Sequence, residues 1–186
     1  MVRVENLDMT FFHASKCAGS SIENWLRTNV AGDVYDNDLR HLHPKQLTHL
    51  FPEGFGWSFC VVRNPWDRMV SWYTYFKKIR GLDISFTDYL DRSFFDKSVQ
   101  NTNMYGKPVR LINYVPHVSH VVRFESLVQD FKIVQEKAGC FTPLDHTNKT
   151  RDNDAYVEYY SSQKYIDLVQ SYYVDDIKLL GYSFGG

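Results

Sequence analysis

The segment FFHASKCAGSSIENWL, residues 11–26, contains an apolar run, a lysine, a turn of small residues and the start of a helix. Short apolar runs that lead directly into helix-start signals are typical of buried parallel strands. We therefore expect a strand over residues 9–14. A helix should begin at Ser20, because Ser20 and Glu23 have the S-x-x-E spacing of a capping box.

Two further apolar runs, residues 58–63 and 120–124, predict strands of the same kind. The first of them leads into NPWD, residues 64–67, which supplies an N-cap, a proline at the first helical position and an early acidic residue. We expect that helix to continue to about Lys78, and further helices over residues 86–91, 127–138, 155–173 and 175–180. This alternation predicts an α/β fold, a three-layer sandwich with a central parallel sheet, in which ligands bind at the carboxyl ends of the strands.

Composition limits the class of protein. The chain has 186 residues, 44% of them hydrophobic, which suits one sizeable core and predicts a single domain over residues 1–186. The formal net charge is −1, from 21 basic and 22 acidic residues. A general nucleic-acid binder needs a broad cationic face, so we expect no nucleic-acid partner and only a local anion site.

The sequence also predicts the cellular compartment of the protein. Its three cysteines, Cys17, Cys60 and Cys140, are far apart and odd in number, which favours neither a zinc cluster nor a disulfide framework and fits a reducing compartment. The first residues lack the apolar core of a signal peptide, and no window approaches the roughly 18 apolar residues of a membrane span. We therefore expect a soluble, cytoplasmic protein without a membrane anchor.

The turn over residues 15–21 is the first candidate site. Backbone N–H groups of the helix start, serine hydroxyls and Lys16 come together there, and such groups bind phosphate. It is not a Walker A motif, because Lys16 precedes Gly19 by three positions instead of following a glycine. The alternative is an ordinary strand-to-helix loop with an exposed lysine.

The second candidate site follows the next strand. Arg63 ends that strand, and Asn64, Arg68 and Ser71 have helical spacing on one face. A guanidinium, a hydroxyl and a helix N-terminus suit a second phosphate. In the alternative interpretation, Asp67 and Arg68 are solvated charges, and the core is formed by the apolar residues of the helix: Trp66, Met69, Val70 and Tyr73.

These motifs resemble a known family. KCAGSS after an apolar strand resembles the 5′-phosphosulfate loop of sulfotransferases, and RNPWDRMVSWY resembles their 3′-phosphate-binding strand and helix. VVRFESL and the segment over residues 148–184 look like the carbohydrate-type branch. The resemblance implies the P-loop-like sulfotransferase fold. It also implies transfer of a sulfuryl group from 3′-phosphoadenosine-5′-phosphosulfate (PAPS) to a hydroxyl or amine of an acceptor, for which we expect a carbohydrate, leaving the nucleotide product PAP.

The resemblance also implies roles for individual residues. Lys16 corresponds to the lysine at the bridging oxygen of PAPS, and the 5′-phosphate is held by the rest of the loop: Cys17, Ala18, Gly19, Ser20 and Ser21. Arg63 and Ser71 correspond to the ligands of the 3′-phosphate. Lys149 and Arg151 match a late loop that closes over the nucleotide. No metal is implied.

The acceptor must lose a proton, and a neutral imidazole suits that step near pH 7. His41 aligns with the histidine that serves as base in the family, and His43 is the second candidate. Two alternatives stay open: either histidine caps or packs locally, or His41 and His43 bind a metal with Asp36, Asp38 or His49. We expect His13, on the first strand, to be a hydrogen-bonded packing residue.

Two other functions remain possible from the sequence. A nucleotide-dependent phosphotransferase would need Mg²⁺ and a carboxylate to hold it near the phosphate loop. A noncatalytic module would bind the nucleotide without turnover. Golgi members of the family carry a membrane anchor and disulfide-bearing segments, and we recognise neither in this sequence. We therefore expect this chain to be of a bacterial or viral type.

Overall fold

The computed structural model describes residues 1–30, 39–98, 105–145 and 155–186. The chain divides into two compact units, and each is described by itself. Unit 1 comprises Met1–Arg63 and Val109–Asn148, and unit 2 comprises Asn64–Pro108 and Lys149–Gly186. A single domain over the whole chain stays a prediction. None of the helices in the described ranges has the length and apolar character needed to cross a bilayer.

Unit 1 is built on a four-stranded sheet in the order β1-β2-β3-β4. Its strands are β1 (Val2–Val4), β2 (Met9–Phe12), β3 (Trp57–Val62) and β4 (His120–Arg123). β2 pairs with β3 and β3 with β4 in parallel, whereas β1 runs antiparallel to β2 at the edge. The three predicted strands and the largely parallel sheet are confirmed. β1 was not predicted, because three residues are too few for a recognisable alternation.

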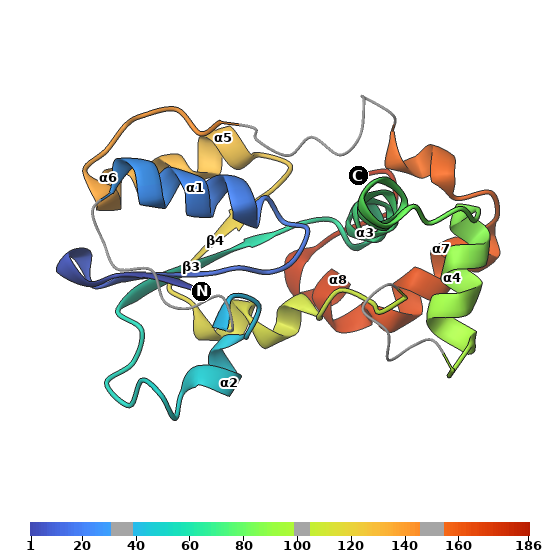
Figure 1. Ribbon diagram of the computed structural model, residues 1–186, viewed down its shortest axis with the longest axis horizontal. Helices are drawn as coiled ribbons and strands as arrows, with labels where there is room; N and C mark the ends of the chain where they lie inside the picture. The colour runs from blue at the N-terminus through green and yellow to red at the C-terminus, as the bar shows by residue number, and fades with distance from the viewer. Residues whose placement is uncertain (31–38, 99–104, 146–154) are drawn as a thin grey trace. The chain divides into compact units, whose positions relative to one another are not determined.

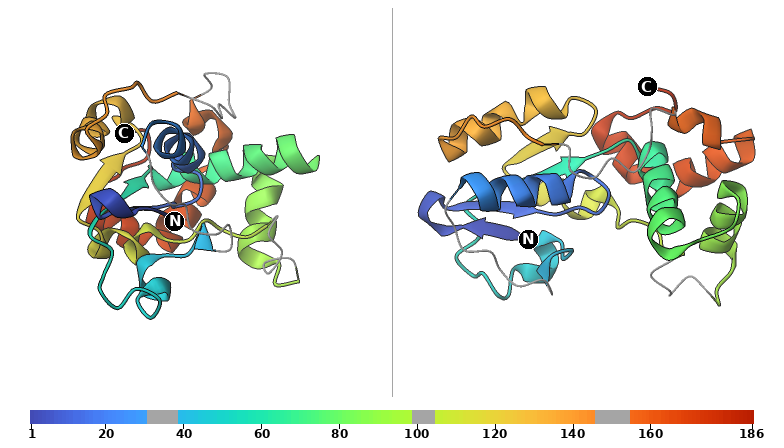
Figure 2. Two further views of the ribbon diagram at one scale, coloured as in Figure 1. Left: turned by 60° about the vertical axis from the view of Figure 1, so that its left-hand side comes forward. Right: turned by 45° about the horizontal axis from the view of Figure 1, so that its top comes forward.

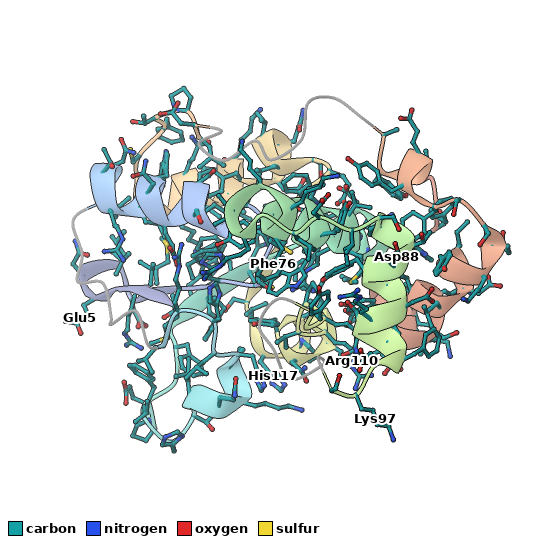
Figure 3. All side chains as sticks on the ribbon, turned by 45° about the vertical axis from the view of Figure 1, so that its right-hand side comes forward. Glu5, Phe76, Asp88, Lys97, Arg110 and His117 are labelled. Carbon is teal, nitrogen blue, oxygen red and sulfur yellow. The ribbon has the colours of Figure 1, made fainter. Side chains whose placement is uncertain are left out.

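Helices cover both faces of this sheet (Figure 1). On one side lie α1 (Gly19–Asn29), α5 (Leu127–Asp130) and α6 (Lys132–Ala138), and on the other lie α2 (Pro44–Leu47) and the short turns η3 (Leu111–Asn113) and η4 (Val115–His117). The labelled His117 side chain in Figure 3 is on the α2 side. Phe11 and Phe59 pair across β2 and β3 with ring centroids 4.9 Å apart, and both are buried. This pair contributes to the apolar core that covers the sheet, as is typical of parallel sheets.

Unit 2 is helical. Its elements are α3 (Pro65–Arg80), α4 (Phe86–Phe95), η5 (Tyr156–Tyr159), α7 (Gln163–Tyr172) and α8 (Val174–Leu180). α3 begins as predicted, because the Asn64 side chain accepts a hydrogen bond from the Trp66 N–H at 3.1 Å and Pro65 follows the cap. α3 lies beside α4 and α7 in both views of Figure 2 and makes contacts with each.

The charges on the first turns of α3 are not solvated. Arg68 is 1% exposed and Asp67 is also buried, so the interpretation of both as surface charges is wrong. The apolar part of that interpretation is confirmed, since Trp66, Met69 and Val70 are buried. Asp67 lies in the first turn of the helix, where the helix dipole stabilises a carboxylate.

Candidate active site

In unit 1, the first candidate loop and Arg63 of the second candidate motif meet at one edge of the sheet. Phe12 pairs with Cys60 in the parallel register, so β2 and β3 end side by side. The Arg63 guanidinium, just beyond β3, donates a hydrogen bond at 3.0 Å to the backbone carbonyl of Lys16, in the loop beyond β2. This contact brings together two of the residues that we predicted to lie at the carboxyl ends of the strands.

The loop has an unusual backbone. Lys16 has φ 64° and Ala18 has φ 57°, both in the left-handed region. A side chain there costs roughly 1–2 kcal/mol relative to the right-handed region. Such residues cluster at ligand sites, and left-handed residues alternating with ordinary ones turn successive N–H groups toward one concave side that suits an anion.

The start of α1 leaves its amides without a side-chain cap. α1 begins at Gly19 and its N-cap is Ala18, whose methyl group cannot accept a hydrogen bond. First-turn N–H groups without a cap form a natural anion site. The predicted capping box at Ser20 and Glu23 is wrong, because the Glu23 carboxylate turns to His13 and Arg40 instead.

Gly19 is required by the packing of the loop. A Cβ atom added at Gly19 would lie 2.0 Å from Cδ2 of the His13 ring. His13 is buried, and its Nδ1 lies 2.7 Å from Glu23 Oε1. Since a carboxylate can only accept, Nδ1 carries the hydrogen. The expectation that His13 is a hydrogen-bonded packing residue is confirmed.

Two cations lie close together in this loop. Burial and, to a smaller extent, the nearby Arg63 charge lower the pKa of the Lys16 ammonium to about 8, while Cys17 opposes the shift. The Arg63 guanidinium is itself buried and stacks on the Phe124 ring, 3.9 Å from its centroid. Lys16 is thus half-buried, unlike the exposed lysine of an ordinary loop. A bound anion would relieve the repulsion between the two cations.

His41 lies against the same loop. Its ring centroid is 4.7 Å from that of His13, and its Nδ1 is 3.5 Å from the His13 carbonyl oxygen. Its own carbonyl accepts a hydrogen bond from the Tyr114 hydroxyl at 3.2 Å. Burial lowers the pKa of His41, and the neighbouring His13 lowers it further, so the imidazole is neutral at pH 7.

His43 lies at the start of α2. Its backbone N–H donates to Gln46 Oε1 at 3.1 Å, and its ring centroid is 6.0 Å from that of Tyr114. Burial lowers the pKa of His43, and Lys45 and His117 lower it further. Its backbone contact fits the local capping alternative.

The metal alternative has no geometric support within the described ranges, where no three His, Cys, Asp or Glu side chains are grouped to hold a metal ion. Asp36 and Asp38, which that alternative invoked, lie outside the described residues.

The sequence did not predict the ion pair between Glu23 and Arg40. Glu23 is 7% exposed, and its Oε2 lies 2.7 Å from a terminal guanidinium nitrogen of Arg40. Burial raises the pKa of Glu23, but the hydrogen bonds and charges of His13 and Arg40 outweigh it and hold the pKa below its usual value. Glu23 was interpreted as a cap, and Arg40 has no motif of its own. The one available signal was the position of Arg40 next to His41.

The remaining predicted residues fall in three places. In unit 1, Cys17 is buried with its Sγ 3.6 Å from the Ser15 carbonyl, and Ser21 is buried in the first turn of α1. In unit 2, Ser71 is buried on α3, and its role beside Arg63 stays a prediction. Lys149 and Arg151 lie outside the described residues.

Two solved structures share this architecture. A sulfotransferase from Alicyclobacillus acidocaldarius aligns over 96% of this chain and 94% of its own, with a TM-score of 0.56 at 14% identity. A mouse sulfotransferase in complex with PAP aligns over 95% of this chain and 86% of its own, with a TM-score of 0.60 at 12% identity. The chain has the sulfotransferase fold, as the sequence predicted.

A relative in sequence is archaeal. Over 99 residues, which are 53% of this chain and 80% of the relative, the chain is 31% identical to an uncharacterized protein of Archaeoglobus fulgidus. The chain belongs to the same family as this protein. No protein-family model matches the chain.

The Gly19 contact gives a test of the loop geometry. Gly19→Ala places a methyl group against the His13 ring, so we expect it to lower the free energy of unfolding by about 1–3 kcal/mol, the usual cost of overpacking. Urea denaturation of Gly19→Ala, His13→Ala and the double variant measures the coupling. Gly19→Ala should lower the free energy of unfolding much less in the His13→Ala background, where the ring is absent. An equal cost in both backgrounds would contradict the contact.

Proposed function

We propose that the protein is a sulfotransferase that moves a sulfuryl group from PAPS to a hydroxyl or amine of an acceptor and releases PAP. The observation that carries the proposal is the half-buried Lys16 ammonium beside the Arg63 guanidinium, in a strained loop at the start of α1. The two structural neighbours support it, since both are sulfotransferases and one binds PAP.

Lys16 has the chemistry that sulfuryl transfer needs. The reaction is an in-line displacement, in which the bond from sulfur to the 5′-phosphate oxygen breaks as the bond to the acceptor oxygen forms. The electron pair of the broken bond stays on the phosphate oxygen, where negative charge grows. An ammonium at that oxygen stabilises the transition state more than the ground state. Lys16 would therefore act as the catalytic cation.

His41 is the better candidate for the base that takes the acceptor proton. Its ring touches His13, whose own ring packs on Gly19 of the phosphate loop, so His41 lies beside that loop. Its lowered pKa keeps the imidazole neutral and able to accept a proton. His43, in contrast, uses its backbone to begin α2.

The nucleotide contacts follow from the motifs. The 5′-phosphate would lie on the amides at the start of α1 and the hydroxyls of Ser20 and Ser21. We assign the 3′-phosphate to Arg63 and Ser71, and closure over the nucleotide to Lys149 and Arg151, on their match to the family motifs. A carbohydrate acceptor of the carbohydrate-type branch is proposed on the same basis.

Nucleotide binding tests the proposal directly. PAP without metal should stabilise the protein in a thermal-shift assay, because at a concentration 100 times Kd a ligand adds about 2.7 kcal/mol. Sulfuryl transfer from PAPS to a panel of glycans and small hydroxyl compounds should then be detectable. Stabilisation by ATP with Mg²⁺ but not by PAP would contradict the proposal and favour a phosphotransferase. Binding of PAP without turnover would favour a noncatalytic module.

Lys16→Ala should lower turnover by on the order of 10²–10³, the scale for losing one preorganised donor. Because Lys16 must be charged and its pKa lies at about 8, kcat/KM of the natural protein should fall as the pH rises through that value. The matched control is Lys132→Ala, which removes an exposed lysine from α6. If Lys16→Ala keeps near-normal turnover, Lys16 has no part in the mechanism.

His41→Ala should lower the rate by roughly 10²–10⁴, the range for losing a general base, while the affinity for PAP stays intact. His43→Ala is the matched comparison and should keep most of the activity. The acid limb of the rate profile should lie below pH 6.5, because burial lowers the pKa of His41 from that value. A large loss in His43→Ala alone would assign the base to His43.

A further inference from the structure

We propose that Arg40 is a positioning residue, which ties the segment that carries His41 to the phosphate loop through Glu23 and Ser20. The inference rests on the proposed function, in which His41 is the base, and it adds the group that holds His41 in place. Arg40 touches neither the nucleotide nor the acceptor in this scheme. It acts through the residues that do.

The contacts of Arg40 reach two parts of α1. Its Nε donates to Glu23 Oε1 at 3.2 Å, and a terminal nitrogen lies 2.7 Å from Glu23 Oε2. The same terminal nitrogen donates to Ser20 Oγ at 3.1 Å. Two bonds from one guanidinium to the two oxygens of one carboxylate fix its orientation as well as its position, because both groups are planar.

The burial of Glu23 makes this pair different from an ordinary surface ion pair. Exposed pairs contribute little, because water screens the charges and the side chains lose entropy. The Glu23 side chain is 9% exposed and that of Arg40 is 36% exposed. A buried carboxylate that loses one partner keeps an uncompensated charge, which is strongly unfavourable. The protein therefore has a strong energetic reason to keep Arg40 on Glu23.

The same carboxylate also fixes the residue against which His41 packs. Glu23 Oε1 accepts from His13 Nδ1 at 2.7 Å, and the His13 ring meets the His41 ring edge to face. On the other side, the Tyr114 hydroxyl donates to the His41 carbonyl. The segment is thus held by Glu23 through the Arg40 side chain, by the Met1 ammonium through the Arg40 carbonyl at 3.1 Å, and by Tyr114 through the His41 carbonyl.

The orientation of the His41 ring follows from these contacts. Its Nδ1 lies at hydrogen-bond distance from the His13 carbonyl oxygen, which can only accept, so Nδ1 carries the hydrogen. A neutral imidazole then has its lone pair on Nε2, the atom that would receive the acceptor proton. Loss of the Arg40 tether would let the ring leave the His13 carbonyl and lose this tautomer preference.

Ser20 links the tether to the nucleotide side. Because Arg40 donates to Ser20 Oγ, the hydroxyl hydrogen of Ser20 has to point to another acceptor. In the proposed function that acceptor is an oxygen of the 5′-phosphate. One guanidinium would therefore set both the hydroxyl that binds the phosphate and the segment that carries the base.

The test compares Arg40→Gln with Arg27→Gln, which removes the same charge from the exposed side of α1. The imidazole nitrogen shifts of His41, measured by long-range ¹H–¹⁵N NMR, report its tautomer without any need for turnover. In the natural protein and in Arg27→Gln they should show hydrogen on Nδ1. In Arg40→Gln they should move to the averaged values of a mobile ring. Unchanged His41 shifts in Arg40→Gln would overturn the inference.

Activity supplies the second readout. Arg40→Gln should lower kcat by on the order of 10²-fold, the loss expected when a catalytic group is misplaced by about 1 Å, with a much smaller change in PAP affinity. Arg40→Lys keeps the charge but not the planar fork, so it should recover only part of kcat. A normal kcat in Arg40→Gln would overturn the positioning role.

The outcomes separate the tether from the proposed function. If the natural protein neither binds PAP nor transfers a sulfuryl group, the proposed function fails, whereas the NMR comparison still decides whether Arg40 fixes His41. If Arg40→Gln does not fold, Arg40→Lys takes its place, and His41 shifts that match those of the natural protein would then count against the tether. His41 shifts displaced in a folded Arg40→Lys variant would support it.

Discussion

The parallel pairing of β2 with β3 is the constraint on which the candidate site depends. Because the two strands end at the same edge, the loop that follows β2 and the arginine that follows β3 meet in space although 47 positions separate them in the chain. A shift of this register would move Arg63 away from the Lys16 carbonyl and turn the strand side chains to opposite faces. The buried Phe11–Phe59 pair helps to hold the register.

The site combines a buried carboxylate that has two partners with two neighbouring cations. Glu23 has both an arginine and a histidine as partners, so it forms a stable internal anchor. Lys16 and Arg63 are two neighbouring like charges, and Lys16 lies in a loop with a strained backbone. A buried ion pair that supports the site, together with a strained loop beside two cations, suits the binding of an anionic ligand at a defined point.

The sequence predicted the parts of the fold that depend on neighbouring residues. α3 begins at Asn64 and Pro65 as expected, because a cap and a proline act within one turn. The capping box at Ser20 failed because Glu23 finds a stronger partner in Arg40, 17 residues further along the chain. No local rule predicts such a pair. The histidines could be recognised as candidates in the sequence, but the contacts of Arg40 with Glu23 and Ser20 could not be predicted from it. The roles of Ser71, Lys149 and Arg151 are still predictions.

The lowered proton affinity of Lys16 has a consequence for binding itself. Above pH 8 much of the free protein carries a neutral amine at this position. A phosphorylated ligand that binds there raises the pKa of Lys16 and favours the ammonium. Binding is therefore accompanied by uptake of a proton from the medium. The heat of binding would then vary with the ionisation enthalpy of the buffer, and the protein would gain its anion most readily in neutral or acidic surroundings.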